Sequence, residues 1–203
     1  MGREIAPVMG YQGARWLERA SRNREEAADR LVQMLPIKDG DRVADIGAGT
    51  GYMSFRIANR IPAGDVFAVD VQPQMIDLLQ QKITDTQTDN VIPILGQEQA
   101  LDLKENSIDL ALMVDVYHEL SYPFEMLGAI AKALKPDGKL LLAEYKAESP
   151  RVMIKPLHKM SQAQVKAELE VAGFEFKQNL RGLPQQHLLI FEKAEAKAAK
   201  AKN

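Results

Sequence analysis

The chain has 203 residues, 46% of them hydrophobic, and a formal net charge of −2. This length and apolar content suffice for one domain with a substantial core and are short for two. The balanced charge produces no overall field that would attract nucleic acid or an anionic membrane, so we expect neither as a partner. The sequence contains no cysteine, which excludes disulfides, thiolate metal ligands and a thiol nucleophile.

The first segment, residues 1–36, is predicted to be an N-terminal arm. Its start lacks the apolar centre of a signal peptide, and no apolar run in the chain has membrane-spanning length, so we expect a cytoplasmic protein. The apolar spacing over residues 24–35 predicts one helix. Upstream, Trp16 and Arg19 combine aromatic and cationic side chains. Both an ordered arm and a lid over a binding site fit this pattern.

Apolar strands alternate with amphipathic helices over residues 37–193, the predicted main domain. We expect strands at residues 42–46, 66–71, 91–95, 107–114, 139–145, 174–179 and 188–192, and helices at 53–61, 73–83, 124–134 and 161–172. This alternation favours a doubly wound α/β sheet with helices on both faces. The last stretch, residues 194–203, is rich in alanine and lysine and is predicted to be disordered.

Three alternating glycines, Gly47, Gly49 and Gly51, connect the first strand to a helix. Glycines allow a sharp turn and a close ligand, and the helix start adds free N–H groups. A dinucleotide fingerprint would require glycine at the position of Tyr52. Asp45, two residues ahead of the glycines, opposes a pyrophosphate and suits a ligand that bears an amino group and a sulfonium. The loop, with Tyr52 beside it, therefore predicts binding of S-adenosylmethionine.

This segment resembles the first motif of the class I S-adenosylmethionine-dependent methyltransferases, an acid-x-G-x-G-x-G run after a strand. The Leu-Lys-Pro-Asp-Gly at residues 134–138 and the Ser-Ile-Asp at 107–109 are similar to the family as well. The resemblance covers roughly residues 39–193. It implies a Rossmann-like, mostly parallel sheet of seven strands in the order 3-2-1-4-5-7-6, with an antiparallel last strand. It also implies S-adenosylmethionine as methyl donor and S-adenosylhomocysteine as product.

Further cofactor contacts are expected where the other strands end. Asp70 closes the second strand, with Val71 next to it, and can accept hydrogen bonds from ribose hydroxyls. The resemblance implies an acid that recognises adenine, and here Gln97 stands at its position with Glu98 one residue later. Asp115, after the fourth strand, is expected near the methionine end of the cofactor.

The sequence contains three histidines, His118, His158 and His187. If the last strand is antiparallel, as the resemblance implies, all three lie at the carboxyl edge of the sheet and line one side of the cofactor. A histidine suits general-base catalysis near neutral pH. We expect His118 to be catalytic, with Glu119 or Tyr117 orienting it or the substrate.

The same edge supplies predicted substrate contacts, namely Tyr145, Lys146, His158 and His187. The three histidines and Glu119 also suit a metal by residue type, but no pair has diagnostic spacing, so we predict no metal.

The expected function is methyl transfer from S-adenosylmethionine to a small molecule, at oxygen, nitrogen or carbon. Three alternatives stay open: a cofactor-binding module without catalysis, a methyltransferase of a macromolecule and, least favoured, a nicotinamide-dependent oxidoreductase. The sequence does not indicate an oligomeric state.

Overall fold

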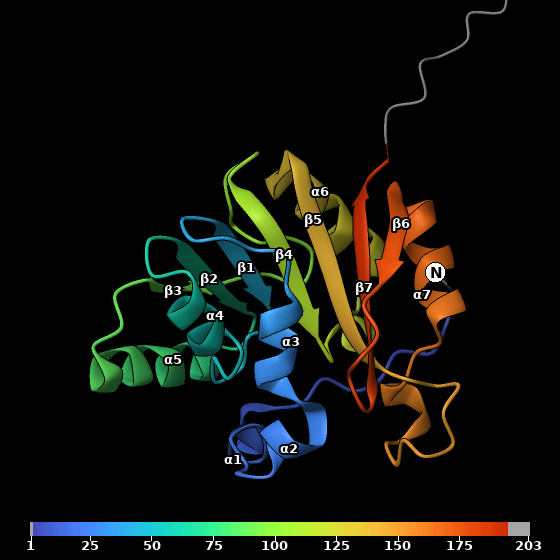
Figure 1. Ribbon diagram of the computed structural model, residues 1–203, viewed down its shortest axis with the longest axis horizontal. Coiled ribbons are helices and arrows are strands. Elements are labelled where there is room, and N and C mark those ends of the chain that lie inside the picture. The colour runs from blue at the N-terminus through green and yellow to red at the C-terminus, as the bar shows by residue number, and fades with distance from the viewer. Residues whose placement is uncertain (1, 195–203) are drawn as a thin grey trace, which may run out of the picture.

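The computed structural model describes residues 2–194 and contains a seven-stranded sheet in the order β3-β2-β1-β4-β5-β7-β6 (Figure 1). The strands are β1 Arg42–Ile46, β2 Asp65–Asp70, β3 Val91–Leu95, β4 Ile108–Val114, β5 Leu134–Tyr145, β6 Phe174–Asn179 and β7 Gln186–Lys193. Strands β1 to β5 pair in parallel, and β7 is antiparallel to both β5 and β6. The predicted order and the antiparallel last strand are confirmed.

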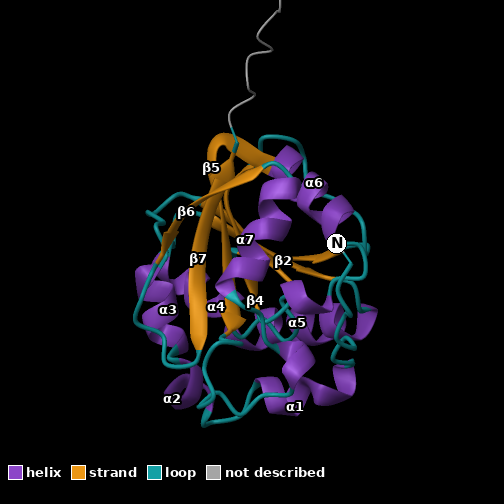
Figure 2. Ribbon diagram, turned by 90° about the vertical axis from the view of Figure 1, so that its right-hand side faces the viewer, coloured by secondary structure: helices purple, strands orange, loops and turns teal. Residues whose placement is uncertain are grey.

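Helices cover both faces of the sheet, as predicted (Figure 2). They are α1 Ala14–Leu17, α2 Arg22–Glu26, α3 Ala28–Met34, α4 Ser54–Arg60, α5 Pro73–Thr86, α6 Pro123–Ala133 and α7 Gln162–Val171, with short 3-10 turns η1 Tyr11–Gly13, η2 Tyr117–Glu119 and η3 Pro156–His158. Helices α3, α4 and α5 pack on one face, and α6 and α7 pack on the other. The central strands β1, β2, β4 and β5 are mostly apolar because both of their faces are buried.

Several helix ends follow from single residues. The Ser161 hydroxyl accepts the N–H of Gln164 at 3.1 Å and caps α7. Prolines open α5 and α6, where the missing N–H is harmless. Gly173 ends α7 with a φ of +83°, a conformation that glycine adopts without strain.

Two predicted boundaries are wrong. The helix expected over residues 24–35 is two helices, α2 and α3, because Ala27 between them has a left-handed φ of 57°. The break lets Glu26 turn inward to buried ion pairs while α3 packs its apolar side on the sheet. The strand expected at residues 139–145 begins earlier, at Leu134, and a register shift between Ile108 and Leu110 interrupts its pairing with β4.

The N-terminal arm crosses the carboxyl edge of the sheet, where α1 and α2 lie below the strands in Figure 1. The Arg3 side chain donates to Glu168 of α7, at 3.1 Å, and to two carbonyls of η2. Gln72, beside the end of β2, donates to the carbonyl of Met9 at 3.0 Å and accepts the N–H of Tyr11 at 2.9 Å. The first part of the arm, from Arg3 to Tyr11, is therefore bonded to the main domain.

Within residues 2–194, no helix is long and apolar enough to cross a membrane. Apart from Ala194, the tail that the sequence predicts to be disordered lies outside the described residues.

Candidate functional site

A pocket of about 560 Å³ opens at the carboxyl ends of the central strands. The glycine loop, the ends of β2 and β4, the segment after β5 and the N-terminal arm form its walls. In open α/β sheets this edge is where ligands bind. The arm contributes Val8, Met9, Trp16, Leu17 and Arg22 to the lining.

The glycine loop approaches the pocket with Gly47 and Gly49. Both have positive φ, +72° and +55°. A Cβ on Gly47 would lie 2.5 Å from a methyl group of Val116, and one on Gly49 would lie 2.9 Å from Leu17 of the arm. Any side chain here would therefore clash, in addition to straining the backbone.

Gly51 and Tyr52, which the sequence also predicts to bind the cofactor, pack against the protein instead. A Cβ on Gly51 would lie 2.6 Å from Leu79 of α5, so this glycine permits helix packing. Tyr52 is buried, and the guanidinium groups of Arg22 and Arg56 lie 4.3 and 3.8 Å from its ring centroid. Neither residue is among those that line the pocket.

At the end of β2, the carboxylate of Asp70 is held by backbone donors. It accepts the N–H of Gly49 on one oxygen and the N–H of Gln72 on the other, both at 2.9 Å. Burial raises the pKa of Asp70, and these two hydrogen bonds oppose that rise. Each oxygen keeps a lone pair for a further donor. The predicted contacts Val71, Gln97 and Glu98 also line the pocket.

Two more acids line the pocket from buried positions. Burial raises the pKa of Asp45 to about 6, although the hydroxyl of Ser54 donates to it at 2.6 Å. Burial also raises the pKa of Asp115, and the charges of nearby carboxylates add to the rise. One oxygen of Asp115 accepts from Gln186 at 2.7 Å. Within residues 2–194 the other oxygen, Oδ1, has no hydrogen-bond partner.

Arg22 belongs to the pocket and was not predicted. It is 6% exposed, donates to Glu26 at 2.8 Å and helps to keep the carboxylate of Asp45 charged. Glu26 also accepts the hydroxyl of Tyr145 at 3.1 Å, which fixes that predicted substrate contact in the pocket wall. In the sequence, the i, i+4 spacing of Arg22 and Glu26 indicates this ion pair.

His118 is buried at the far side of the pocket and paired with Glu144 of β5. Its Nδ1 lies 2.6 Å from Glu144 Oε2, and the other oxygen of Glu144 accepts the N–H of Tyr117 at 2.8 Å. Burial acts to lower the pKa of His118, but the charge of Glu144 and hydrogen bonds with Glu119 and Glu144 raise it to about 10. Glu144 was not predicted, although a lone acid inside an apolar strand indicates a buried partner.

His158 and Glu119 complete this side of the pocket. His158 Nδ1 lies 3.1 Å from His118 Nε2, so the predicted proximity of these two histidines is confirmed. Burial and the charge of His118 lower the pKa of His158. Glu119 places one oxygen 3.5 Å from His158 Nδ1, and the other accepts the N–H of Met9 from the arm at 3.3 Å.

Three of the predicted catalytic and substrate-binding residues do not reach the pocket. The ring of Tyr117 is fully buried on the α7 side of the sheet, and its hydroxyl donates to Glu168 at 2.8 Å. His187 and Lys146 line a separate hollow beyond β5. There His187 Nε2 lies 2.9 Å from Glu148, while Lys146 donates to the carbonyl of Leu183 at 2.8 Å. The expectation that all three histidines line one site is therefore wrong for His187, because it lies one strand further out than Glu144 and faces the separate hollow.

This fold and pocket define an α/β protein whose ligand site lies at the carboxyl edge of the sheet, between a glycine loop and strand-end acids. A family model described as a methyltransferase domain matches residues 44–140. Over these residues, just under half of its length, the chain is similar to methyltransferase domains.

Individual relatives share part of this domain. An uncharacterized methyltransferase of Mycobacterium tuberculosis is 34% identical over 99 residues, which are 49% of this chain and 37% of the relative. A tRNA U34 carboxymethyltransferase of Desulfotalea psychrophila is 33% identical over 121 residues, 58% of this chain and 37% of the relative. The matches thus span less than half of these relatives' length.

Among solved structures, an S-adenosylmethionine-dependent methyltransferase from Aquifex aeolicus superposes with a TM-score of 0.85. Its sequence identity is 23%, and the match covers 91% of this chain and 98% of that one. At this identity the similarity establishes the fold.

Proposed function

We propose that this protein transfers a methyl group from S-adenosylmethionine to a small acceptor molecule. The observation that carries the proposal is the set of acids around the glycine loop, above all Asp115. A buried carboxylate oxygen without a partner is unfavourable, so Oδ1 of Asp115 suits an ammonium group supplied by a ligand.

The remaining contacts follow the chemistry of the cofactor. The two oxygens of Asp70 accept the ribose hydroxyls, and the backbone at Gly47 and Gly49 lies against the ligand. Gln97 and Glu98 stand on the adenine side. Asp45 adds negative charge under a ligand that carries a sulfonium.

The cofactor supplies an electrophilic methyl group: the acceptor atom bonds to carbon as the carbon–sulfur bond breaks and its electron pair stays on sulfur. Positioning provides much of the catalysis of such a displacement. His118, Glu119, His158 and Tyr145 line the acceptor side, and Glu144 is a positioning residue because it acts through the ring of His118.

Thermal unfolding with S-adenosylmethionine, S-adenosylhomocysteine or NAD added separately tests the proposal. A ligand at a hundredfold excess over its Kd stabilises by about 2.7 kcal/mol, a rise of roughly 5–10 °C in Tm for a chain of this size. We expect this rise with the two sulfur compounds and none with NAD.

The matched variants are Asp70→Asn, in the site, and Asp65→Asn, at the exposed opposite end of the same strand. The first should lose the shift and the second should keep it. A shift with NAD alone, or equal shifts in both variants, would refute the assignment. Release of S-adenosylhomocysteine in a screen of small acceptors then separates an enzyme from a cofactor-binding module.

A further inference from the structure

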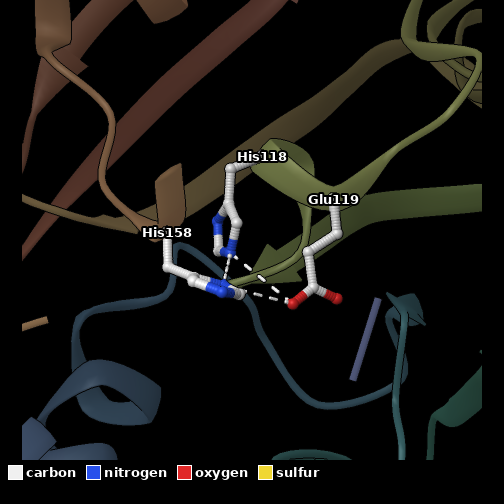
Figure 3. Close-up of side chains that lie close together, drawn as sticks. All are labelled: His118, Glu119 and His158. Carbon is white, nitrogen blue, oxygen red and sulfur yellow. Dashed lines mark hydrogen bonds and ion pairs between the residues drawn. The ribbon is translucent and has the colours of Figure 1, made fainter. Parts of the chain in front are cut away.

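Three metal-ligating side chains converge on one point at the acceptor side of the pocket. His118 and Glu119 come from η2 and His158 from η3, and Figure 3 shows them pointing toward one another. His118 Nε2 lies 3.1 Å from His158 Nδ1 and 3.7 Å from Glu119 Oε1, and His158 Nδ1 lies 3.5 Å from the same oxygen.

These three separations match the edges of a metal coordination shell. Zinc binds imidazole nitrogen and carboxylate oxygen at about 2.0–2.2 Å. A triangle with edges of 3.1, 3.5 and 3.7 Å has room for one ion at that distance from all three corners. Two histidines and one glutamate form a known donor set of catalytic zinc sites, which keep a further position open.

The surroundings hold each ligand in orientation. Glu144 Oε2, 2.6 Å from Nδ1 of His118, fixes that ring nitrogen as the donor and directs Nε2 at the cluster. A carboxylate behind a ligating histidine is the usual support in metal sites. The other oxygen of Glu119 accepts the N–H of Met9, which restrains its carboxylate as well.

We propose that His118 Nε2, Glu119 Oε1 and His158 Nδ1 bind one divalent transition-metal ion, zinc in the first place, with a coordination position open to the pocket. The ion displaces the proton of the histidine nitrogen that donates in the hydrogen bond between the two rings. The spacing of these residues along the chain gave no signal for this site, because the loop after β5 brings His158 to η2 only in the fold. His187, the fourth residue of suitable type, lies in the other hollow.

This site also selects an acceptor, a step that rests on the proposed function. The three ligands line the same pocket as Asp70, and the charge of Glu119 contributes to the raised pKa of that acid. An acceptor with a hydroxyl or carboxyl oxygen can occupy the open position, where the ion lowers the pKa of a bound hydroxyl. The hydroxyl proton leaves to solvent, and the oxygen then bonds to the methyl carbon as the carbon–sulfur bond breaks toward sulfur. We therefore infer O-methylation.

The test is a titration of chelator-treated full-length protein with Co²⁺, followed by its visible absorption, with Zn²⁺ as competitor. We expect one Co²⁺ per chain, in a four- or five-coordinate spectrum that Zn²⁺ abolishes. The variants His158→Ala and Glu119→Gln should lose the spectrum, and Glu144→Gln should weaken affinity about 10–100-fold.

The control is His187→Ala, which removes a histidine that also lies beside a carboxylate. It should bind Co²⁺ like the wild type. Absence of Co²⁺ binding, retention of the spectrum by His158→Ala, or its equal loss in His187→Ala would overturn the proposal. The Tm shift with S-adenosylhomocysteine is measured on the same samples, so a failed metal site is distinguished from a failed cofactor site.

Discussion

Replacing Asp45 by asparagine should stabilise the ligand-free protein at neutral pH. Asp45 is 3% exposed, and burial raises the pKa of its carboxyl group from the ordinary 3.8 to about 6. Because the folded-state pKa is raised, the ionised carboxylate destabilises the fold at pH values above 6. The penalty disappears as pH falls toward the unfolded-state value. This rise in the pKa of Asp45 lowers the free energy of unfolding by about 3 kcal/mol at pH 7.5 and by about 1.5 kcal/mol at pH 5.

Denaturant unfolding of wild type and Asp45→Asn at the two pH values measures this difference. An asparagine oxygen can keep the hydrogen bond from Ser54, so the variant should gain up to about 3 kcal/mol at pH 7.5 and about half of that at pH 5. Asp65→Asn, which changes an exposed acid, should show neither effect. A variant less stable than wild type, or a gain independent of pH, would refute the reasoning. Confirmation would mean that stability is sacrificed at Asp45 for ligand binding.

Two further predictions concern packing away from the pocket. Ala27→Gly should stabilise the protein by about 0.5–1 kcal/mol in denaturant unfolding, because the left-handed backbone at this position strains any residue with a Cβ; a loss of stability would show that its methyl group matters more than the strain. Tyr117→Phe should destabilise by about 1–2 kcal/mol through the lost bond to Glu168 and leave the affinity for S-adenosylhomocysteine unchanged by calorimetry. Weakened affinity would return Tyr117 to the binding site.

The sequence predicted the sheet because its signals are local. Strands buried on both faces are apolar throughout, and the glycine loop must follow the first of them, so the position of Asp70 at the same edge follows from parallel pairing. The break at Ala27 escaped prediction because both sides of it have good helical spacing. The long-range contact of Glu26, which accepts the hydroxyl of Tyr145, leaves no trace in that spacing.

The acceptor side of the pocket depends on long-range contacts that no spacing records. In the sequence, Glu144 is one acid in an otherwise apolar strand segment. Its contact with His118 arises only when β4 and β5 pair. The prediction that His187 lines the pocket was wrong for a related reason. His187 pairs with Glu144 in the sheet but lies one strand further from the pocket. The sheet topology therefore predicts correctly that the site lies at the carboxyl edge. The positions of the side chains are needed to distinguish the two hollows along that edge.

The two oxygens of Glu119 have different tasks. One faces His118 and His158, and the other accepts a backbone N–H from the arm. A carboxylate is rigid, so a displacement of Oε1 of Glu119 also displaces Oε2, which accepts the N–H of Met9. A ligand at the histidines that changed the strength of the bond to Met9 would be affected by that bond in return, by the same free energy. A backbone hydrogen bond from the start of the chain and the histidine cluster at the carboxyl edge of the sheet therefore depend on the same side chain.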